Sequence, residues 1–233
     1  MKERPIIFSG PEVRATLDGR MTQIRRVMKP QPVPCPVRGG YRWWFDEDDS
    51  CWGETPEALA RNILDTVIPP HGSAMDRLWV RETFKGVTSG ETKYIGTTED
   101  GIMVTQGALR YGCAYKADGT VIWDKNTCLV TDLSNKGESG PMQFKERKWS
   151  SPLHMPRRFS RLLLEITKVR VERVQEISED DAWAGGVNVA PGIDPRDSFA
   201  SLWYATYGDR PGRYWEDNPW VWAITFKVVE EGR

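Results

Sequence analysis

One run of residues constrains the fold more than any other, the segment 161–178 with the sequence RLLLEITKVRVERVQEIS. Its apolar residues change from even to odd positions along the run: Leu162, Leu164 and Ile166, then Val169 and Val171. Successive side chains of a strand point to opposite faces of a sheet, so this change requires a bulge or a sharp bend. Bends of this kind turn the corners of small β-barrels. The segment therefore predicts one long bent strand.

Two other segments predict core strands. The C-terminal segment 218–229 has a continuous apolar face at its even positions: Trp220, Trp222, Ile224, Phe226 and Val228. The segment 76–84 places Leu78, Val80 and Glu82 on one face. Two readings of that carboxylate stay open. Glu82 lies either inside the core, where a buried charge needs a partner, or at the rim of the sheet in water.

Helix signals separate these strands. Ser9 can cap a helix that ends at Gly19, Ser178 can cap one that ends at Gly185, and a third begins at Asp194-Pro195 and ends near Gly208. The order of elements predicts an α+β fold. We expect a small, partly open, mixed β-barrel with short helices packed over its ends, because regular βαβ alternation is missing.

Two stretches interrupt this pattern, and we interpret the chain as a single domain over residues 1–233 with insertions at about 30–75 and 85–150. The first insertion combines prolines, an acidic run at 46–49 and a modest helical pattern around 56–66. The second is rich in Gly, Thr, Ser and Lys and is expected to be irregular. Its candidate strands are 112–117 and, more weakly, 120–123.

The net charge of -1 gives no indication of nucleic-acid binding, but the charges are segregated along the chain. Residues 147–173 are mostly basic and residues 174–218 mostly acidic. Four cysteines without CxxC spacing and two histidines predict neither a metal site nor a cofactor. With no signal peptide evident and no apolar run of about 20 residues, we expect a cytoplasmic protein that does not enter membranes.

The familiar catalytic signatures are missing from the sequence, among them GxSxG, the P-loop, HExxH and GxGxxG after a strand. Acid–base chemistry would therefore have to use Glu82, a lysine, Tyr115 or His154. Of these, Glu82 is the candidate catalytic residue.

Two arginine-rich stretches are candidates for anion binding, since arginine binds phosphate or carboxylate bidentately. Arg20, Arg25 and Arg26 follow the first helix, and His154, Arg157 and Arg158 precede the long bent strand. Together they could line one cleft. The alternative is that the arginines form ion pairs with the acidic segment 174–218.

Further candidates for ligand binding come from two aromatic residues and one more arginine. Among the eleven tryptophans and the tyrosines, Trp220 and Tyr115 are candidates for stacking on a base. The alternative is that they fill the core. Arg81 lies on the opposite face of its strand from Glu82 and completes the candidate set.

Five stretches together resemble the phage and prophage branch of the ASCH domain family: GRMTQIRR, DRLWVRETF, HMPRRFSRLLLEIT, VERVQEISEDDAWAGGV and NPWVWAITF. The resemblance covers the first 30 residues, 76–84 and most of 149–229, and leaves both insertions outside. It implies a PUA-like β-barrel that binds RNA or modified nucleotides in the cytoplasm of a bacterial host.

The family motif GxKxxxxR falls on Gly19, Met21 and Arg26, so the lysine is replaced. Family members that hydrolyse N4-acetylcytidine use this lysine, a threonine three positions later and a later glutamate. Here those positions hold Met21 and Ile24, with Glu82 as the candidate glutamate. Thr22 is next to the lysine position but points to the other side of a strand. Methionine cannot carry a proton and isoleucine cannot act as a nucleophile, so this route to hydrolysis is not expected.

Three functional hypotheses follow, in this order. The first is a module that binds RNA or a modified nucleotide in a basic cleft. The second is a nucleoside amidohydrolase or ribonuclease that uses other residues. The third is a phage-encoded protein that acts on a host protein partner.

Overall fold

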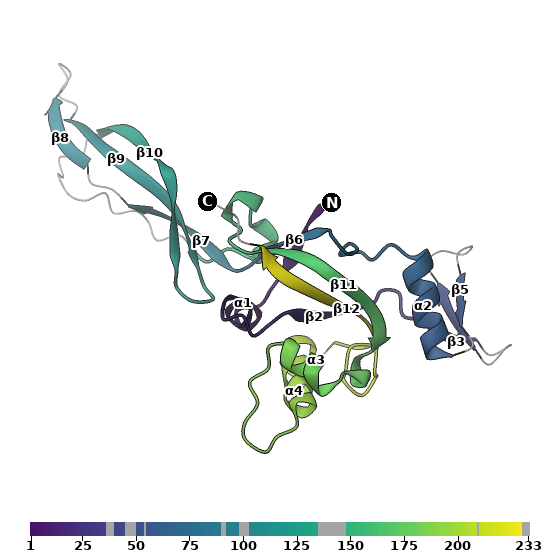
Figure 1. Cartoon of the computed structure of the whole chain (residues 1–233). Helices are drawn as coiled ribbons and strands as arrows, with labels where there is room; N and C mark the ends of the chain where they lie inside the picture. The colour runs from purple at the N-terminus through teal and green to yellow at the C-terminus, as the bar shows by residue number, and fades with distance from the viewer. Residues whose placement is uncertain are drawn as a thin grey trace. The chain divides into compact units, whose positions relative to one another are not determined.

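The structure is a computed structural model, a mixed α+β fold with several sheets and short helices (Figure 1). It describes the backbone of residues 1–35, 40–44, 50–53, 55–89, 92–97, 103–134, 148–208 and 210–229. Side chains are described for residues 1–32, 55–87, 113–122, 148–208 and 210–229. The chain divides into two compact units. The first comprises Met1–Ile6, Pro11–Val80 and Arg161–Arg233, and the second comprises Ile7–Gly10 and Arg81–Ser160.

The first unit is built on a five-stranded sheet. The strand order is β1 (Glu3–Ile7), β6 (Arg77–Arg81), β11 (Leu163–Arg173), β12 (Trp220–Val229) and β2 (Gln23–Val27). β11 runs antiparallel to β6 and β12, and β12 runs antiparallel to β2. This pairing of the described strands is an open path and not a closed barrel. The PUA-like barrel therefore stays a prediction.

The bulge predicted from the change of register is confirmed. Ile166 pairs with Phe226 and Lys168 pairs with Thr225, so Thr167 is an extra residue in β11. Ile166 is fully buried before the bulge, and Val171 is 6% exposed after it. The bulge thus lets one strand bury apolar residues from both registers.

β12 is buried on both faces. Its even residues from Trp220 to Phe226 are each at most 2% exposed, as predicted, whereas Val228 at the end of the strand is 44% exposed. The odd residues Val221 and Ala223 are also fully buried. The second buried face was not evident from alternation, and it arises because helices pack on the sheet. Val221 belongs to the same core cluster as Phe199 of the helix α4 (Pro195–Tyr207).

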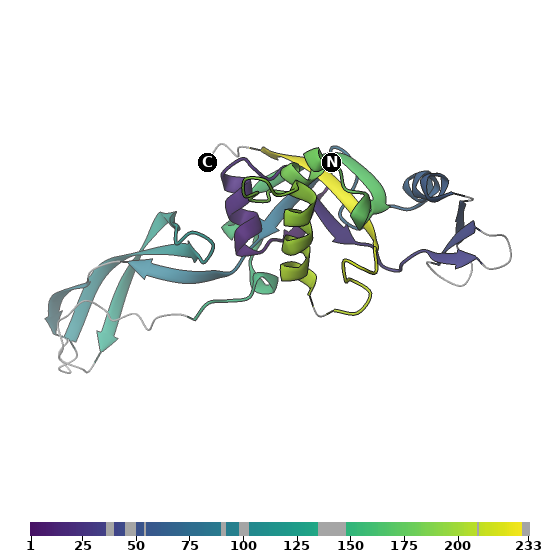
Figure 2. The same ribbon diagram turned by 90° about the horizontal axis from the view of Figure 1, so that it is seen from below.

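The predicted helix ends are confirmed for the two helices after β11. Ser178 accepts a hydrogen bond from the backbone N–H of Asp181 at the start of α3 (Glu179–Ala184), which ends at Gly185. Asp194 caps α4 (Pro195–Tyr207), which ends at Gly208. α1 (Gly10–Leu17) is followed by Gly19, whose φ of 72° lies in the left-handed region that favours glycine. Figure 2 shows α1 and α4 side by side.

The first insertion forms regular structure. It contains the three-stranded sheet β3 (Val33–Cys35), β4 (Gly40–Trp44) and β5 (Ser50–Gly53), followed by α2 (Pro56–Thr66). The helical pattern around 56–66 is therefore confirmed. Leu59 and Ile63 of α2 are fully buried, one turn apart on one face. The acidic run at 46–49 lies outside the described residues.

The second unit contains a four-stranded antiparallel sheet, so the expected irregular structure of its described part is wrong. Its strands are β7 (Phe84–Ser89), β8 (Thr92–Thr97), β9 (Met103–Tyr115) and β10 (Val121–Ser134). The candidate strands at 112–117 and 120–123 fall on parts of β9 and β10. A stretch rich in Gly, Ser, Thr and Lys shows little apolar alternation, which is the signal used to predict strands.

No helix in the described ranges combines the length and the apolar character needed to span a bilayer.

We predict that Gly186 cannot be replaced by alanine without a large loss of stability. A Cβ atom there would lie 2.9 Å from Cβ of both Ala15 and Met21, and the φ of 79° is unfavourable for alanine. Gly192 is a matched control, since its φ is 81° and nothing lies within 4 Å of a Cβ atom. Urea unfolding should show a loss of about 1 kcal/mol for Gly192→Ala and about 2 kcal/mol more for Gly186→Ala. Equal losses of stability in the two variants would mean that the contact of Gly186 with Ala15 and Met21 is not tight.

Candidate functional site

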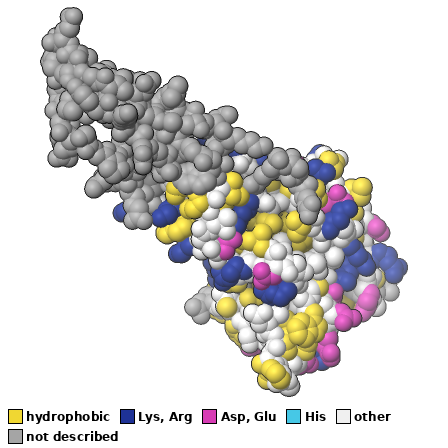
Figure 3. Space-filling model, turned by 60° about the vertical axis from the view of Figure 1, so that its left-hand side comes forward, with side chains coloured by type: hydrophobic (Ala, Val, Ile, Leu, Met, Phe, Trp, Pro, Cys, Tyr) yellow, Lys and Arg dark blue, Asp and Glu magenta, His cyan; other side chains and the backbone are white. Residues whose placement is uncertain are grey.

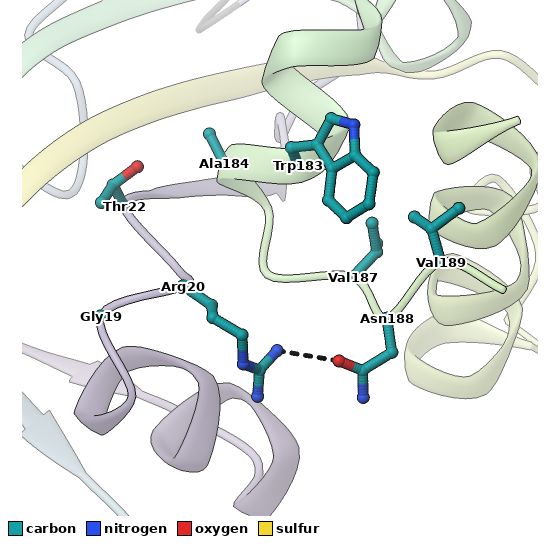
Figure 4. A pocket seen from close by; sticks show the side chains of 8 residues that line it. All are labelled: Gly19, Arg20, Thr22, Trp183, Ala184, Val187, Asn188 and Val189. Atoms are coloured by element: carbon teal, nitrogen blue, oxygen red, sulfur yellow. Dashed lines mark hydrogen bonds between the residues drawn. The ribbon is translucent and has the colours of Figure 1, made fainter. Parts of the chain in front are cut away.

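An open pocket lies in the first unit where the start of β2 meets the end of α3 (Figure 4). Its volume is about 540 Å³, and Arg20, Thr22, Trp183 and Asn188 contribute side chains to its lining. This volume is within the usual range for small-molecule sites. We call it the Arg20 pocket.

Backbone contacts fix the walls of the Arg20 pocket. After Gly19 turns the chain, Met21 forms an isolated antiparallel bridge with Gly185. The N–H of Thr22 donates to the carbonyl oxygen of Ala184 at 2.9 Å. The end of α3 is thereby tied to the start of β2. These backbone contacts fix the distance between the two segments that form opposite walls of the pocket.

Arg20 is held in one orientation by its neighbours. Its Nη1 donates to the Gly186 carbonyl oxygen at 3.0 Å and to Asn188 Oδ1 at 3.1 Å. Its Nη2 donates to Asp18 Oδ2 at 2.9 Å. The side chain is still 39% exposed. Arg20 is therefore a preorganised cation at the surface, and Figure 4 shows its hydrogen bond to Asn188.

Trp183 is the aromatic wall of the Arg20 pocket. It is 51% exposed, whereas its neighbour Ala182 is fully buried in the core cluster under α3. An indole exposed to this degree leaves part of its ring face available for stacking. In Figure 4 the ring lies above Val187, on the same side of the pocket as Ala184.

A smaller pocket of about 170 Å³ adjoins the Arg20 pocket. Arg20, Val187 and Asn188 line both pockets. The smaller pocket is also lined by Arg14 of α1 and Ser198 of α4. Arg20 therefore lies at the boundary between the two pockets.

Arg25 is an interior residue with a different environment. Its side chain is 1% exposed and donates to Glu172 Oε1 at 2.7 Å from Nη2 and at 2.9 Å from Nε. Nη2 also lies 3.3 Å from Asp181 Oδ2, and the guanidinium lies over the Phe199 ring. Burial lowers the pKa of Arg25, and the two carboxylates only partly oppose that effect.

The cavity beside Arg25 is too small for a base. Its volume is about 30 Å³, roughly the share of liquid volume that one water molecule takes. In this structure Arg25 therefore contacts carboxylates of the protein and not a ligand of nucleoside size. For Arg25, the alternative of pairing with the acidic segment 174–218 is observed at Asp181, while its closer partner Glu172 precedes that segment.

Arg26 is also paired inside the first unit. Its Nη1 lies 3.0 Å from Glu12 Oε1. Burial alone would lower the pKa of Arg26, but Glu12 and Tyr207 outweigh it and the pKa is raised. His71 is near this cation, and burial together with Arg26 and Arg4 lowers its pKa to about 4.

Glu82 and Tyr115 are buried in the second unit. The predicted strand 76–84 breaks at Glu82, between β6 and β7, and Glu82 is 2% exposed. The buried reading is thus the observed one. Tyr115 is 1% exposed, and its hydroxyl donates to the Phe159 carbonyl oxygen at 2.8 Å. The ring of Tyr115 has no face open to a base in this structure.

The remaining basic candidates also belong to the second unit. Arg81 Nη1 donates to the Leu153 carbonyl oxygen at 3.4 Å. His154 and Arg158 are exposed, Arg157 is half-buried, and the Arg158 guanidinium lies over the Phe159 ring at 4.9 Å. A cleft shared by these residues and the arginines of the first unit stays a prediction.

Trp220 belongs to the core rather than to a surface. It is 1% exposed, and the Arg173 guanidinium lies 4.6 Å from its ring centre. Stacking on a ligand would require this strand to open. The aromatic side chain that lines the Arg20 pocket is Trp183 instead.

The pocket residues Arg14, Thr22, Trp183 and Asn188 were not among the candidates from sequence. The sequence offered one signal for this site, the large aromatic side chain of Trp183 on a short helix whose first turn is acidic. Asn188 and Arg14 gave no signal, because their role depends on which segments meet in space. On the face in Figure 3, the described Lys and Arg side chains lie among Asp and Glu side chains and form no continuous basic field.

Comparisons of the chain with protein-family models, curated proteins and solved structures found no match. Across the described ranges, no group of three or more His, Cys, Asp or Glu side chains is placed to hold a metal ion. The assignment to a family stays a prediction from motifs. The site must be judged by its own geometry.

We predict that Arg25 and Arg20 differ in their contribution to stability. Arg25→Met should lower the free energy of unfolding by about 3 kcal/mol, because Glu172 and Asp181 lose the cation between them. Arg20→Met should cost about 1 kcal/mol or less, since its ion pair is at the surface. Urea unfolding of both variants checks this. A small loss for Arg25→Met would show that Arg170 alone can hold the two carboxylates.

We predict a pH dependence of stability from His71. Its folded pKa of about 4 is below the ordinary value of 6.5, so between these values the unfolded chain binds a proton that the folded chain does not. The stability contributed by neutral His71 is complete above pH 6.5 and is lost as the pH falls toward 4. Thermal unfolding measured between pH 6.5 and pH 4 should show a smaller loss of stability in His71→Gln than in the wild type. His154→Gln serves as the control, because His154 is exposed. Equal pH profiles for wild type and His71→Gln would contradict this.

Proposed function

We propose that the protein binds RNA or a modified nucleotide, with one base held in the Arg20 pocket. We further propose that the first unit is a PUA-like barrel of the ASCH type that has kept a binding role. The motif resemblance supports this fold, and the open sheet order is compatible with a partly open barrel.

The exposed ring of Trp183 is the observation that carries the proposal. Aromatic side chains bind bases by stacking, which stabilises binding by about 1–3 kcal/mol for each base and works with any base. Thr22 and Asn188 add hydrogen-bonding groups to the lining of the same pocket. An aromatic wall with a few polar groups is the composition expected of a site for a planar, polar ring.

Binding without hydrolysis fits the burial of the two family positions that differ. Met21 is 4% exposed and Ile24 is 2% exposed, and both pack in the apolar interior. Neither side chain can move a proton or attack a carbonyl. The amidohydrolase or ribonuclease alternative would need a different set of residues, and the host-protein alternative would not need the pocket at all.

The test measures binding of short single-stranded RNAs, DNAs and free nucleosides by titration calorimetry, with the samples then examined for product. Trp183→Ala should weaken binding about tenfold or more, because the stacking surface is lost. Ile193→Ala is the matched control, since Ile193 is also 50% exposed and is outside the pocket lining.

Each other result has a distinct meaning. Binding that is unchanged in Trp183→Ala would place the ligand elsewhere and overturn the proposed site. Product formation would favour the enzyme alternative. No binding to any member of the panel would overturn the proposed function and favour a protein partner.

A further inference from the structure

We propose that the smaller pocket beside Arg20 is a phosphate subsite, so that the ligand is a phosphorylated nucleotide and not a bare nucleoside. This inference rests on the proposed function, because it places the phosphate next to the base held by Trp183. It specifies that the ligand carries a phosphate, and it adds the residues of the smaller pocket to those that bind the ligand.

The first argument is the hydrogen-bonding state of Arg20. A guanidinium has five N–H donors, and three of those of Arg20 are used by Gly186, Asn188 and Asp18. Within the described part of the chain, its Nε–H and one N–H of Nη2 have no acceptor. Nε and Nη2 form one of the forked edges with which arginine binds phosphate.

The second argument is that the orientation of Arg20 is already fixed. The three bonds that hold the guanidinium come from the turn before β2 and from the segment after α3, which are tied together by backbone contacts. A long flexible side chain loses rotamer entropy when it binds an anion. Arg20 is already ordered by these bonds, so it loses less entropy on binding an anion than a mobile lysine would.

The third argument is charge. Arg14 is exposed on α1 and lines the smaller pocket together with Arg20. Asp18 neutralises part of the charge of Arg20, and Arg14 adds a second guanidinium to the lining of the smaller pocket. Asp194, which caps α4, is itself bonded to Arg196. Ser198 adds a hydroxyl to the lining.

The fourth argument is the arrangement of the two pockets. They share Arg20, Val187 and Asn188, and their volumes are about 540 and 170 Å³. A nucleotide has its base and its phosphate on opposite sides of the sugar. The larger pocket with Trp183 suits the base, and the smaller polar pocket with Arg14 suits the phosphate.

The experiment titrates the full chain with inorganic phosphate, the four ribonucleosides, their 5′-monophosphates and a single-stranded tetranucleotide. We expect monophosphates to bind about tenfold more tightly than nucleosides, and inorganic phosphate to compete with them. Arg14→Gln should remove most of that gain and leave nucleoside binding unchanged. Arg61→Gln, which removes the same charge from the exposed face of α2, should leave both unchanged.

The results separate this inference from the function on which it rests. If monophosphates and nucleosides bind equally and Trp183→Ala weakens both, the phosphate subsite is overturned and the base site stands. If phosphate binds with dependence on Arg14 but nucleosides and monophosphates do not bind, the anion subsite stands and the base site is overturned. Equal sensitivity of the tetranucleotide and the monophosphates to Arg14→Gln would support the subsite and identify a backbone phosphate as one source.

Discussion

The buried guanidinium of Arg25 is the interaction on which the geometry of the first unit depends. It joins β2 to Glu172 of β11 and to Asp181 of α3, which lie 147 and 156 residues further along the chain. A charge that is 1% exposed is tolerated only if it is paired, so these three segments must stay together for the fold to be stable. Gln23 adds a hydrogen bond from β2 to the same Asp181 carboxylate at 3.0 Å. The Arg20 pocket lies where α3 meets β2, and this network holds its two sides.

The arginines of one short stretch are thereby divided between a structural role and the proposed role in binding. Arg25 and Arg26 are held inside the unit by carboxylates, whereas Arg20 comes before β2 begins and stays partly in water. Their chemistry is the same, and only their position relative to the strand differs. The proposed ligand site therefore uses the arginine that the sheet leaves exposed. The methionine and isoleucine of the same stretch fill the apolar interior.

The tryptophans show the same division. Trp203, Trp220 and Trp222 are each at most 3% exposed and fill the core of the first unit, whereas Trp183 is half-exposed on a six-residue helix. Burial of large aromatic rings stabilises a sheet covered by short helices, because each ring removes a large apolar area from water. The exposed ring receives no such stabilisation from the fold. This difference is the physical reason to assign it a role in binding.

The sequence alone determined those features that depend on local chemistry. The bulge in β11 followed from a change in apolar register, and the ends of α3 and α4 followed from Ser178, Asp194 and two glycines, because alternation and capping act over a few residues. The four-stranded sheet of the second unit left little such signal. The tertiary structure alone decided which candidates face a pocket. The burial of Arg25 and Trp220 depends on contacts between residues up to 189 positions apart, which no local pattern encodes. The same is true of the meeting of Arg14, Arg20 and Trp183 around two adjoining pockets.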